Sequence, residues 1–220
     1  MLDFGELLLF IVALAFSVSF HEFCHGWAAN RLGDPTARFA GRLTMNPIAH
    51  IDPVGTIIAP GVMYLVTNGG AMFGWAKPVP VESRNLKDPR WDGLKVALLG
   101  PISNLFLAAL SAIAIGICAP FGLAHGNALG MLLAQMLHVN VLLAVFNLVP
   151  IPPLDGSWIL DSILPRGAYE TYQRIKPYGF LILVAIILIP ALSSVIIGIP
   201  RQFLTTLFYL LANLVAGAFS

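Results

Sequence analysis

The residues best suited to chemistry in this chain form the motif His21-Glu22-Phe23-Cys24-His25. On a helix, histidines four residues apart lie on one face, so both imidazoles can bind the same zinc ion. The adjacent glutamate can reach a water molecule on that ion and accept its proton. Zinc lowers the pKa of such a water to about 7, which makes hydroxide available at neutral pH. The motif therefore predicts a zinc site at which Glu22 activates water.

The setting of the motif is an apolar run that begins at Leu7. Ionisable residues are costly inside a membrane and usually have a function there. Of the 220 residues, 58% are hydrophobic and only 10% are charged, whereas soluble domains carry about 25% charged residues. We therefore expect an all-α polytopic membrane protein in contact with the lipid bilayer. The net charge of +1, without a basic stripe, gives no indication of nucleic-acid binding.

Five to six apolar segments can position the motif, at residues 7–29, 54–66, 96–119, 131–149, 178–192 and 203–219. Segment 54–66, at about 13 residues, is shorter than the roughly 17 to 25 needed to span, so we expect a re-entrant or half-spanning element. A small β region is predicted around it. Residues 36–53 contain short strand-like pieces, and prolines at alternate positions make 76–82 an edge strand.

The distribution of Lys and Arg predicts the orientation of these segments. Eight such residues lie between 30 and 95, and three more lie between 166 and 176. All eleven fall on one side if 54–66 does not cross the membrane, and the loop 120–130, which has no Lys or Arg, falls on the other. This arrangement obeys the positive-inside rule, so we expect the zinc site to lie nearer the cytoplasmic side.

A catalytic zinc ion typically has three protein ligands and one open position. Asp155 is favoured as the third ligand, because it lies at the inner end of a helix, at a depth similar to that of the histidines. Three prolines and a glycine surround it, which would break the helix and let the carboxylate turn inward. Cys24 is interpreted as a small packing residue. The other candidates are His50, Asp52 and Asp161, whereas His125 and His138 lie at the wrong depth.

The motifs together resemble the site-2 protease family of intramembrane zinc metalloproteases, in its compact prokaryotic branch. The resemblance covers about residues 5–160. It rests on the histidine motif, on Gly-Trp-Ala-Lys-Pro-Val-Pro-Val at 74–81, on Gly100-Pro101-x-x-Asn104, and on Asn147-x-x-Pro150-x-Pro152-x-Leu154-Asp155-Gly156.

This resemblance implies a three-helix catalytic core, with one zinc ion held by His21, His25 and Asp155, and Glu22 as the catalytic acid/base. It also implies regulated intramembrane proteolysis of transmembrane substrates, in a prokaryotic inner membrane. We expect residues 1–220 to form a single domain, with C-terminal helices at about 174–219. The chain has no room for a PDZ or CBS domain. Substrate choice is therefore left to the membrane domain, a second copy of the chain or a regulatory membrane partner.

Five further residues are candidates for holding the substrate or its transition state. Asn104 and Asn147 are amides in apolar helices, where they could bind the scissile carbonyl or instead form a helix–helix hydrogen bond. His50 is a substrate contact or a loop residue that shapes the site entrance. Val79 and Val81 have amides that an edge strand could offer to an unwound substrate by β-augmentation; a rigid interfacial loop is the alternative.

Two other functions remain open from the sequence. The chain could be a zinc-binding membrane transporter or a catalytically inactive scaffold, since intramembrane His and Asp residues also serve ion pathways. Glu22 argues against transport, because a transport site needs no general base beside its ligand. The absence of an inverted repeat argues the same way. Cleavage of a peptide at the membrane surface is the second enzymatic alternative.

Overall fold

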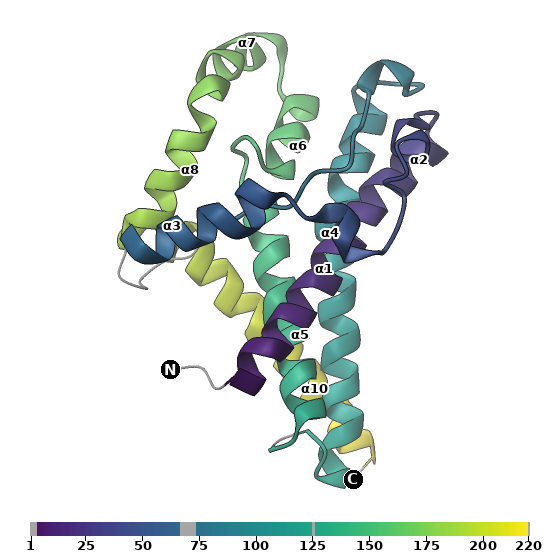
Figure 1. The fold of residues 1–220 in the computed structure, drawn as a ribbon, viewed down its shortest axis with the longest axis vertical. Coiled ribbons are helices and arrows are strands. Elements are labelled where there is room, and N and C mark those ends of the chain that lie inside the picture. The colour runs from purple at the N-terminus through teal and green to yellow at the C-terminus, as the bar shows by residue number, and fades with distance from the viewer. Residues whose placement is uncertain (1–3, 67–73, 125, 220) are drawn as a thin grey trace.

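The computed structural model describes residues 4–66, 74–124 and 126–219, and all the regular structure within these ranges is helical (Figure 1). Four segments are long and apolar enough to cross a membrane. The all-α polytopic expectation is therefore confirmed. The spans are Phe4–Arg31, Trp91–Phe121, Ala128–Asn147 and Pro190–Phe219.

The centre of the molecule is formed by α1 (Phe4–Arg31), α4 (Trp91–Cys118) and α5 (Ala128–Asn147), which pack against one another. In Figure 1 these helices run roughly along the long axis of the molecule, and α10 (Ile199–Phe219) packs on α4 and α5. The helix α1 ends where Gly33 adopts a φ of 114°, a left-handed conformation that favours glycine.

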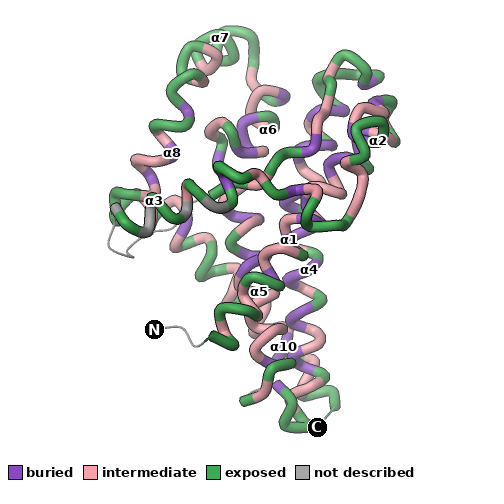
Figure 2. The backbone as a smooth tube through the Cα atoms, in the orientation of Figure 1, coloured by how far each residue is buried: buried purple, intermediate pink, exposed green. Residues whose placement is uncertain are grey.

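Small residues allow α4 and α10 to approach closely. A Cβ atom on Gly116 would lie 2.4 Å from the Ala212 carbonyl oxygen, and Ala108 and Ala112 of α4 are fully buried. Small residues at such contacts are typical of helix packing in membranes. The faces turned away from these contacts are exposed (Figure 2) and carry large apolar side chains such as Phe106. Such an exposed apolar surface is suited to contact with lipid.

The strand-like pieces expected in residues 36–53 are not present, and that expectation was wrong. The segment instead contains α2 (Thr36–Phe39) and a 3-10 turn at Pro47–His50. A π-helical turn at Pro53–Ile58 follows directly. The reason is local capping, which satisfies the free amides of a helix start. The Asn46 side chain accepts from Ile48 N, and the Asp52 side chain accepts from Val54 N and Gly55 N.

Residues 54–66 do not form a full span. They contain α3 (Ala59–Val66), whose eight residues extend about 12 Å, and Figure 1 shows α3 lying across the central helices rather than along them. The expected edge strand at 76–82 is extended, but it makes no β-ladder with any described residue. The region between the first two spans is thus helical turns plus one extended segment.

The C-terminal part differs from the two apolar segments expected at 178–192 and 203–219. The helix α8 (Gly179–Leu188) has only 10 residues and ends before Pro190. From Pro190 a single 30-residue span continues to Phe219. A π-helical turn at Ser194–Gly198 leads directly into α10, so the helical path continues past Pro200.

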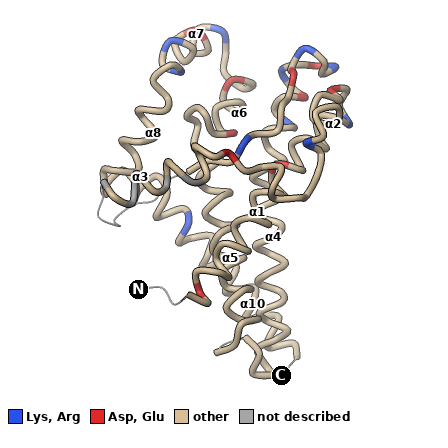
Figure 3. The backbone as a smooth tube through the Cα atoms, in the orientation of Figure 1, with Lys and Arg blue, Asp and Glu red and all other residues tan. Residues whose placement is uncertain are grey.

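Two shorter helices, α6 (Asp155–Ile163) and α7 (Arg166–Ile175), lie at one end of the bundle. Lys and Arg residues gather at this end, around α2, α7 and the start of α4 (Figure 3). The opposite end, where α4 connects to α5, shows no basic residue in the same view. Arg201, within the last span, is an exception to this separation. The one-sided clustering read from the sequence is therefore present in the fold.

Candidate metal centre

Three ligand atoms converge at one point of the bundle. His21 and His25 are one turn apart on α1, and their Nε2 atoms lie 3.0 Å from each other. Asp155 is the first residue of α6, and its carboxylate oxygens lie 3.2 Å from the Nε2 atoms of His21 and His25. Both histidines are buried. The candidate ligand atoms of these three residues, which we call the ligand group, all lie within 4.8 Å of one another.

A tight turn brings Asp155 to the histidines. The helix α5 ends at Asn147, and α6 begins eight residues later at Asp155. A Cβ atom on Gly156 would lie 2.4 Å from the Val149 carbonyl oxygen, so only glycine permits this close return of the backbone. The helix-breaking surroundings noted in the sequence thus direct the carboxylate toward α1.

The donor atoms fit a zinc ion. His21 Nδ1 donates to Asn104 Oδ1 at 2.6 Å, and His25 Nδ1 donates to the Val96 carbonyl oxygen at 2.8 Å. With the proton on Nδ1, each Nε2 carries a bare lone pair, which is the form that binds a metal. Asp155 Oδ2 is buried and has no hydrogen-bond donor among the described residues. With zinc bonds of about 2.0 Å, tetrahedral ligand atoms lie about 3.3 Å apart, close to the separations found here.

Gly100 of α4 closes one side of this centre. A Cβ atom there would lie 2.4 Å from His25 Nε2 and 2.6 Å from His21 Cε1. Real Cβ atoms essentially never come within 3.0 Å of another heavy atom. The sequence motif that contains Gly100 is therefore needed to keep the volume beside the two imidazoles free of side-chain atoms.

Glu22 is held by an extended stretch that we call the covering segment, Trp75–Glu82. Val79 N donates to Glu22 Oε2 at 2.7 Å. The Val79 amide, which the sequence suggested would be free for a substrate, is therefore already occupied. The segment is tied at both ends, because Lys77 N donates to the His50 carbonyl oxygen and Glu82 N donates to Asp34 Oδ2.

Asp34 anchors the far end of the covering segment. Its buried carboxylate accepts from Thr36 N at 3.1 Å, from Asn85 Nδ2 at 2.9 Å and from Glu82 N at 2.7 Å. Burial alone would raise the pKa of Asp34, but these hydrogen bonds, together with that from the Thr36 hydroxyl, lower the pKa below its ordinary value of 3.8. The ionised carboxylate thus ties the end of α1 to the covering segment.

The other predicted site residues lie outside the ligand group. Asn104 contacts the Nδ1 side of His21, where its side-chain oxygen accepts a hydrogen bond from the imidazole. Asn147 donates to the Leu143 carbonyl oxygen of its own helix. His50 is buried and donates from Nε2 to the Thr44 carbonyl oxygen, and no partner for its Nδ1 is found in the described part of the chain. Val81 packs near the buried residues at the end of α1.

The alternative third ligands are also outside the ligand group. Asp52 caps the turn that precedes α3, and Asp161 pairs with Lys176, which directly follows α7. His138 donates to the Ala134 carbonyl oxygen within α5. His125 lies outside the described residues. Cys24 is half-buried and forms no disulfide bond.

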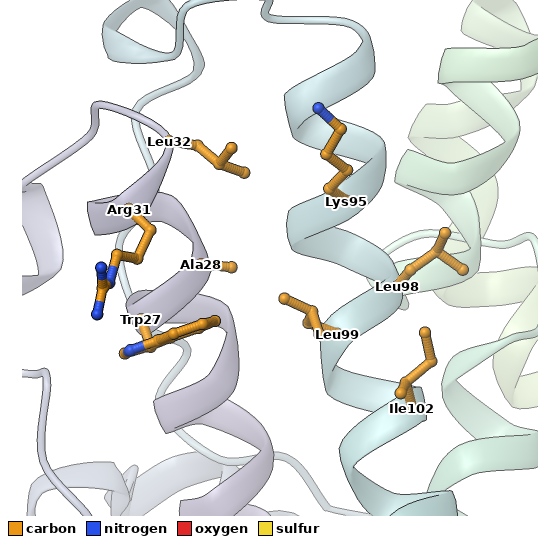
Figure 4. A pocket seen from close by; sticks show the side chains of 8 residues that line it. All are labelled: Trp27, Ala28, Arg31, Leu32, Lys95, Leu98, Leu99 and Ile102. Carbon is orange, nitrogen blue, oxygen red and sulfur yellow. The ribbon is translucent and has the colours of Figure 1, made fainter.

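A separate groove runs along the contact between α1 and α4 (Figure 4). Its volume is about 470 Å³, and most of its lining side chains are apolar. None of the proposed zinc ligands lines it, so it is not part of the metal centre. The lining residues are Trp27, Ala28, Arg31, Leu32, Lys95, Leu98, Leu99 and Ile102.

Sequence reasoning missed three supporting residues. Asn140 of α5 is fully buried and bonded to Asn104; an amide two turns before Asn147 in an apolar helix was the available signal. Gly156 was noted only as part of a motif, and Asp34 was not singled out. Their roles depend on contacts with distant segments, which no local pattern reports.

A bundle of membrane-spanning helices that carries two helical histidines, a converging carboxylate and an adjacent glutamate defines the class of multi-pass membrane zinc proteases. The chain belongs to peptidase family M50, which its residues 9–122 and 114–190 match. This family assignment confirms the resemblance drawn from the motifs.

Curated relatives agree with that assignment. The protein named "Putative zinc metalloprotease YwhC" from Bacillus subtilis is 36% identical over 190 residues, which cover 84% of this chain and 83% of the relative. The protein named "Putative zinc metalloprotease Rip2" from Mycolicibacterium smegmatis is 28% identical over 193 residues, covering 86% of this chain and 70% of the relative. No solved structure matches the chain at a significant level.

Proposed function

We propose that this zinc protease cleaves peptide bonds in or near the transmembrane segments of other proteins, as in regulated intramembrane proteolysis. The observation that supports this most directly is the position of the ligand group inside the helical bundle. At 1.5 Å per residue, His25 and His21 lie about 9 Å and 15 Å along α1 from its end at Arg31. A site at that depth is accessible to a bond in or near the membrane.

Glu22 is the proposed general base. Val79 N occupies Oε2, and Oε1, which has no partner among the described residues, is the oxygen available for the proton. His21, His25 and Asp155 hold the metal, which when bound lowers the pKa of its water to about 7 and polarises a carbonyl group. Protonated Glu22 can then return the proton to the leaving amine.

Substrate binding requires local unwinding, because the peptide carbonyl of a transmembrane helix is shielded by its own hydrogen bonds. The freed backbone groups then need partners. Within the described residues, Val81 N and the Val79 carbonyl oxygen have no hydrogen-bond partner and point to the same edge of the extended chain, so they are the proposed docking edge. Substrates with Gly or Asn near the scissile bond are expected to be cut faster.

The proposed location is a prokaryotic inner membrane, with the metal centre nearer the cytoplasm. The clustering of Lys and Arg around α2, α7 and the start of α4 supports this orientation. The relatives from bacteria support the kind of cell.

The test uses the purified chain in detergent micelles and in liposomes. A panel of labelled transmembrane peptides is incubated with the protein, with and without a zinc chelator, and with zinc added back. Glu22→Gln is the matched control, because it keeps all three ligands. The proposal expects cleavage that chelation abolishes, zinc restores and Glu22→Gln lacks. Absence of cleavage of every transmembrane peptide, with cleavage of soluble peptides instead, would refute the intramembrane assignment; zinc flux into liposomes without any cleavage would favour transport.

A further inference from the structure

A chain of buried hydrogen bonds extends from the metal centre into the middle of the bundle. His21 Nδ1 lies 2.6 Å from Asn104 Oδ1, and Asn104 Nδ2 lies 2.8 Å from Asn140 Oδ1. Asn140 Nδ2 in turn lies 2.7 Å from the Met136 carbonyl oxygen and 2.8 Å from Ser17 Oγ. Ser17, Asn104 and Asn140 are all fully buried. The chain joins α1, α4 and α5, and its three central side chains are shielded from solvent.

The direction of every bond in this chain is fixed from its far end. The Met136 carbonyl oxygen can only accept a hydrogen bond, so the Asn140 amide must direct its NH₂ group toward Met136. The Asn140 oxygen then faces Asn104, which must donate a hydrogen bond to it from its own NH₂ group. The Asn104 oxygen therefore faces His21, and an oxygen that can only accept requires the imidazole proton on Nδ1.

The hydroxyl of Ser17 cannot fix this direction, because a hydroxyl rotates and can either donate or accept. In this chain it accepts from Asn140 Nδ2 and donates toward Met136 Sδ at 3.9 Å. The Ser17 carbonyl oxygen, 3.5 Å from Asn104 Nδ2, favours the same direction. The carbonyl oxygens of Met136 and Ser17 can only accept, so they determine the direction of the hydrogen bonds in the chain.

The two histidine ligands differ in how their proton is placed. His25 Nδ1 donates directly to the Val96 carbonyl oxygen, so its tautomer is fixed by the backbone. His21 faces a side-chain amide, and a primary amide can present either its oxygen or its NH₂ group. A flipped Asn104 would favour the proton on His21 Nε2, and that nitrogen could then not bind a metal. The tautomer of His21, unlike that of His25, therefore depends on a further residue that fixes the orientation of the Asn104 amide.

We propose that Asn140 is a positioning residue of the metal centre, which sets the tautomer of His21 through Asn104 and so keeps His21 Nε2 free for the metal. This inference rests on the proposed function for its biological meaning, since it assumes that His21 is a zinc ligand. Its physical content, the protonation site of His21 in the metal-free protein, can be measured separately.

The experiment uses full-length, metal-free protein labelled with ¹⁵N-histidine, at an alkaline pH chosen so that the His21 spectrum itself shows a neutral imidazole. The His21 signals are assigned by their loss in His21→Gln. Wild-type protein should show His21 with its proton on Nδ1. Asn140→Leu, which is similar in size but has no polar group, should show a mixture of the two tautomers. Its zinc affinity, measured by competition with a chromophoric chelator, should fall about 10-fold, the lower end for groups that orient a ligand.

Two further variants separate proton placement from general damage to the fold. Asn140→Asp still presents an acceptor to Asn104, whether ionised or bonded through its own proton to the Met136 carbonyl, so His21 should keep its proton on Nδ1 even if the protein is less stable. Ser111→Ala removes a different buried hydrogen bond of α4, that to the Leu107 carbonyl oxygen, and should change neither measurement.

The proposal is overturned if Asn140→Leu keeps His21 entirely in the Nδ1-protonated form, or if Asn140→Asp gives the same mixture as Asn140→Leu. Wild-type protein that binds no zinc would refute the proposed function instead. The tautomer of His21 in the metal-free protein would still decide this inference in that case.

Discussion

Gly100→Ala places one methyl group against the metal centre. The added Cβ would lie 2.4 Å from His25 Nε2, whereas ordinary van der Waals contact begins at 3.4 Å. The imidazole or the helix α4 must therefore retreat by about 1 Å, which is several times the tolerance of about 0.2 Å on a zinc–ligand distance. Since His21 Cε1 is also within 2.6 Å of the new atom, the shift cannot be absorbed by one histidine alone.

We expect Gly100→Ala to weaken zinc binding by about 100-fold, the upper end for disturbance of the groups that orient a ligand. Zinc affinity is measured by chelator competition on the purified protein, and circular dichroism checks that the helices are intact. Gly93→Ala is the matched control, because it lies in the same helix and its Cβ would meet no atom within 4 Å. Wild-type zinc affinity in Gly100→Ala would refute the close approach of α4 to the two imidazoles.

Four further outcomes are expected. Glu22→Gln should lower the rate of cleavage by about 10² to 10⁴-fold with zinc still bound, because the amide cannot accept a proton; an active variant would remove Glu22 as the base. Asp155→Ala should lower zinc affinity by at least about 100-fold, since two protein ligands remain; unchanged affinity measured by chelator competition would place the third ligand elsewhere. Lys87→Cys should react with an impermeant thiol reagent only from the cytoplasmic side, and labelling from outside would overturn the orientation. Because the folded-state pKa of Asp34 is lowered, its stabilising effect is present above pH 3.8 and is lost as the pH falls through the folded-state pKa; the difference in melting temperature between wild type and Asp34→Asn should shrink on acidification, and a constant difference would contradict the role of the ionised carboxylate.

The parts of the centre that are local in sequence could be predicted from it. His21 and His25 are one helical turn apart, so helix geometry alone places both imidazoles on one face. Asp155 was favoured because its expected depth matches that of the histidines and because clustered prolines and a glycine break the preceding helix. Neither prediction required knowledge of how α1 packs against α4.

The supporting contacts depend on helix register and could not be predicted. Asn104 is separated from His21 by 83 positions, and its bond to Nδ1 exists only because α4 packs on α1 at one particular height. The same amide would have made an ordinary helix–helix hydrogen bond at another register. The bond between Val79 N and Glu22 spans 57 positions and has the same origin.

Two errors arose from the priority given to competing local signals. Asn46-Pro47 and Asp52-Pro53 each combine a capping side chain with a proline at the first helical position, and these signals outweighed the extended pattern of the residues around them. Near the C-terminus, the apolar pattern was divided into the segments 178–192 and 203–219. Of Pro190 and Pro200, only Pro190 follows the end of a helix, whereas Pro200 lies within a helical path that continues through the turn at Ser194–Gly198.

The covering segment also affects how neighbouring molecules meet in a crowded bilayer. An exposed extended backbone is a template on which strands of other chains can assemble. In its central three residues, Pro78 and Pro80 have no N–H group, and the single remaining amide, that of Val79, is bound by Glu22. A second copy therefore finds no free donor in these three residues, so strand pairing along the segment is confined to the proposed docking edge at Val81 N.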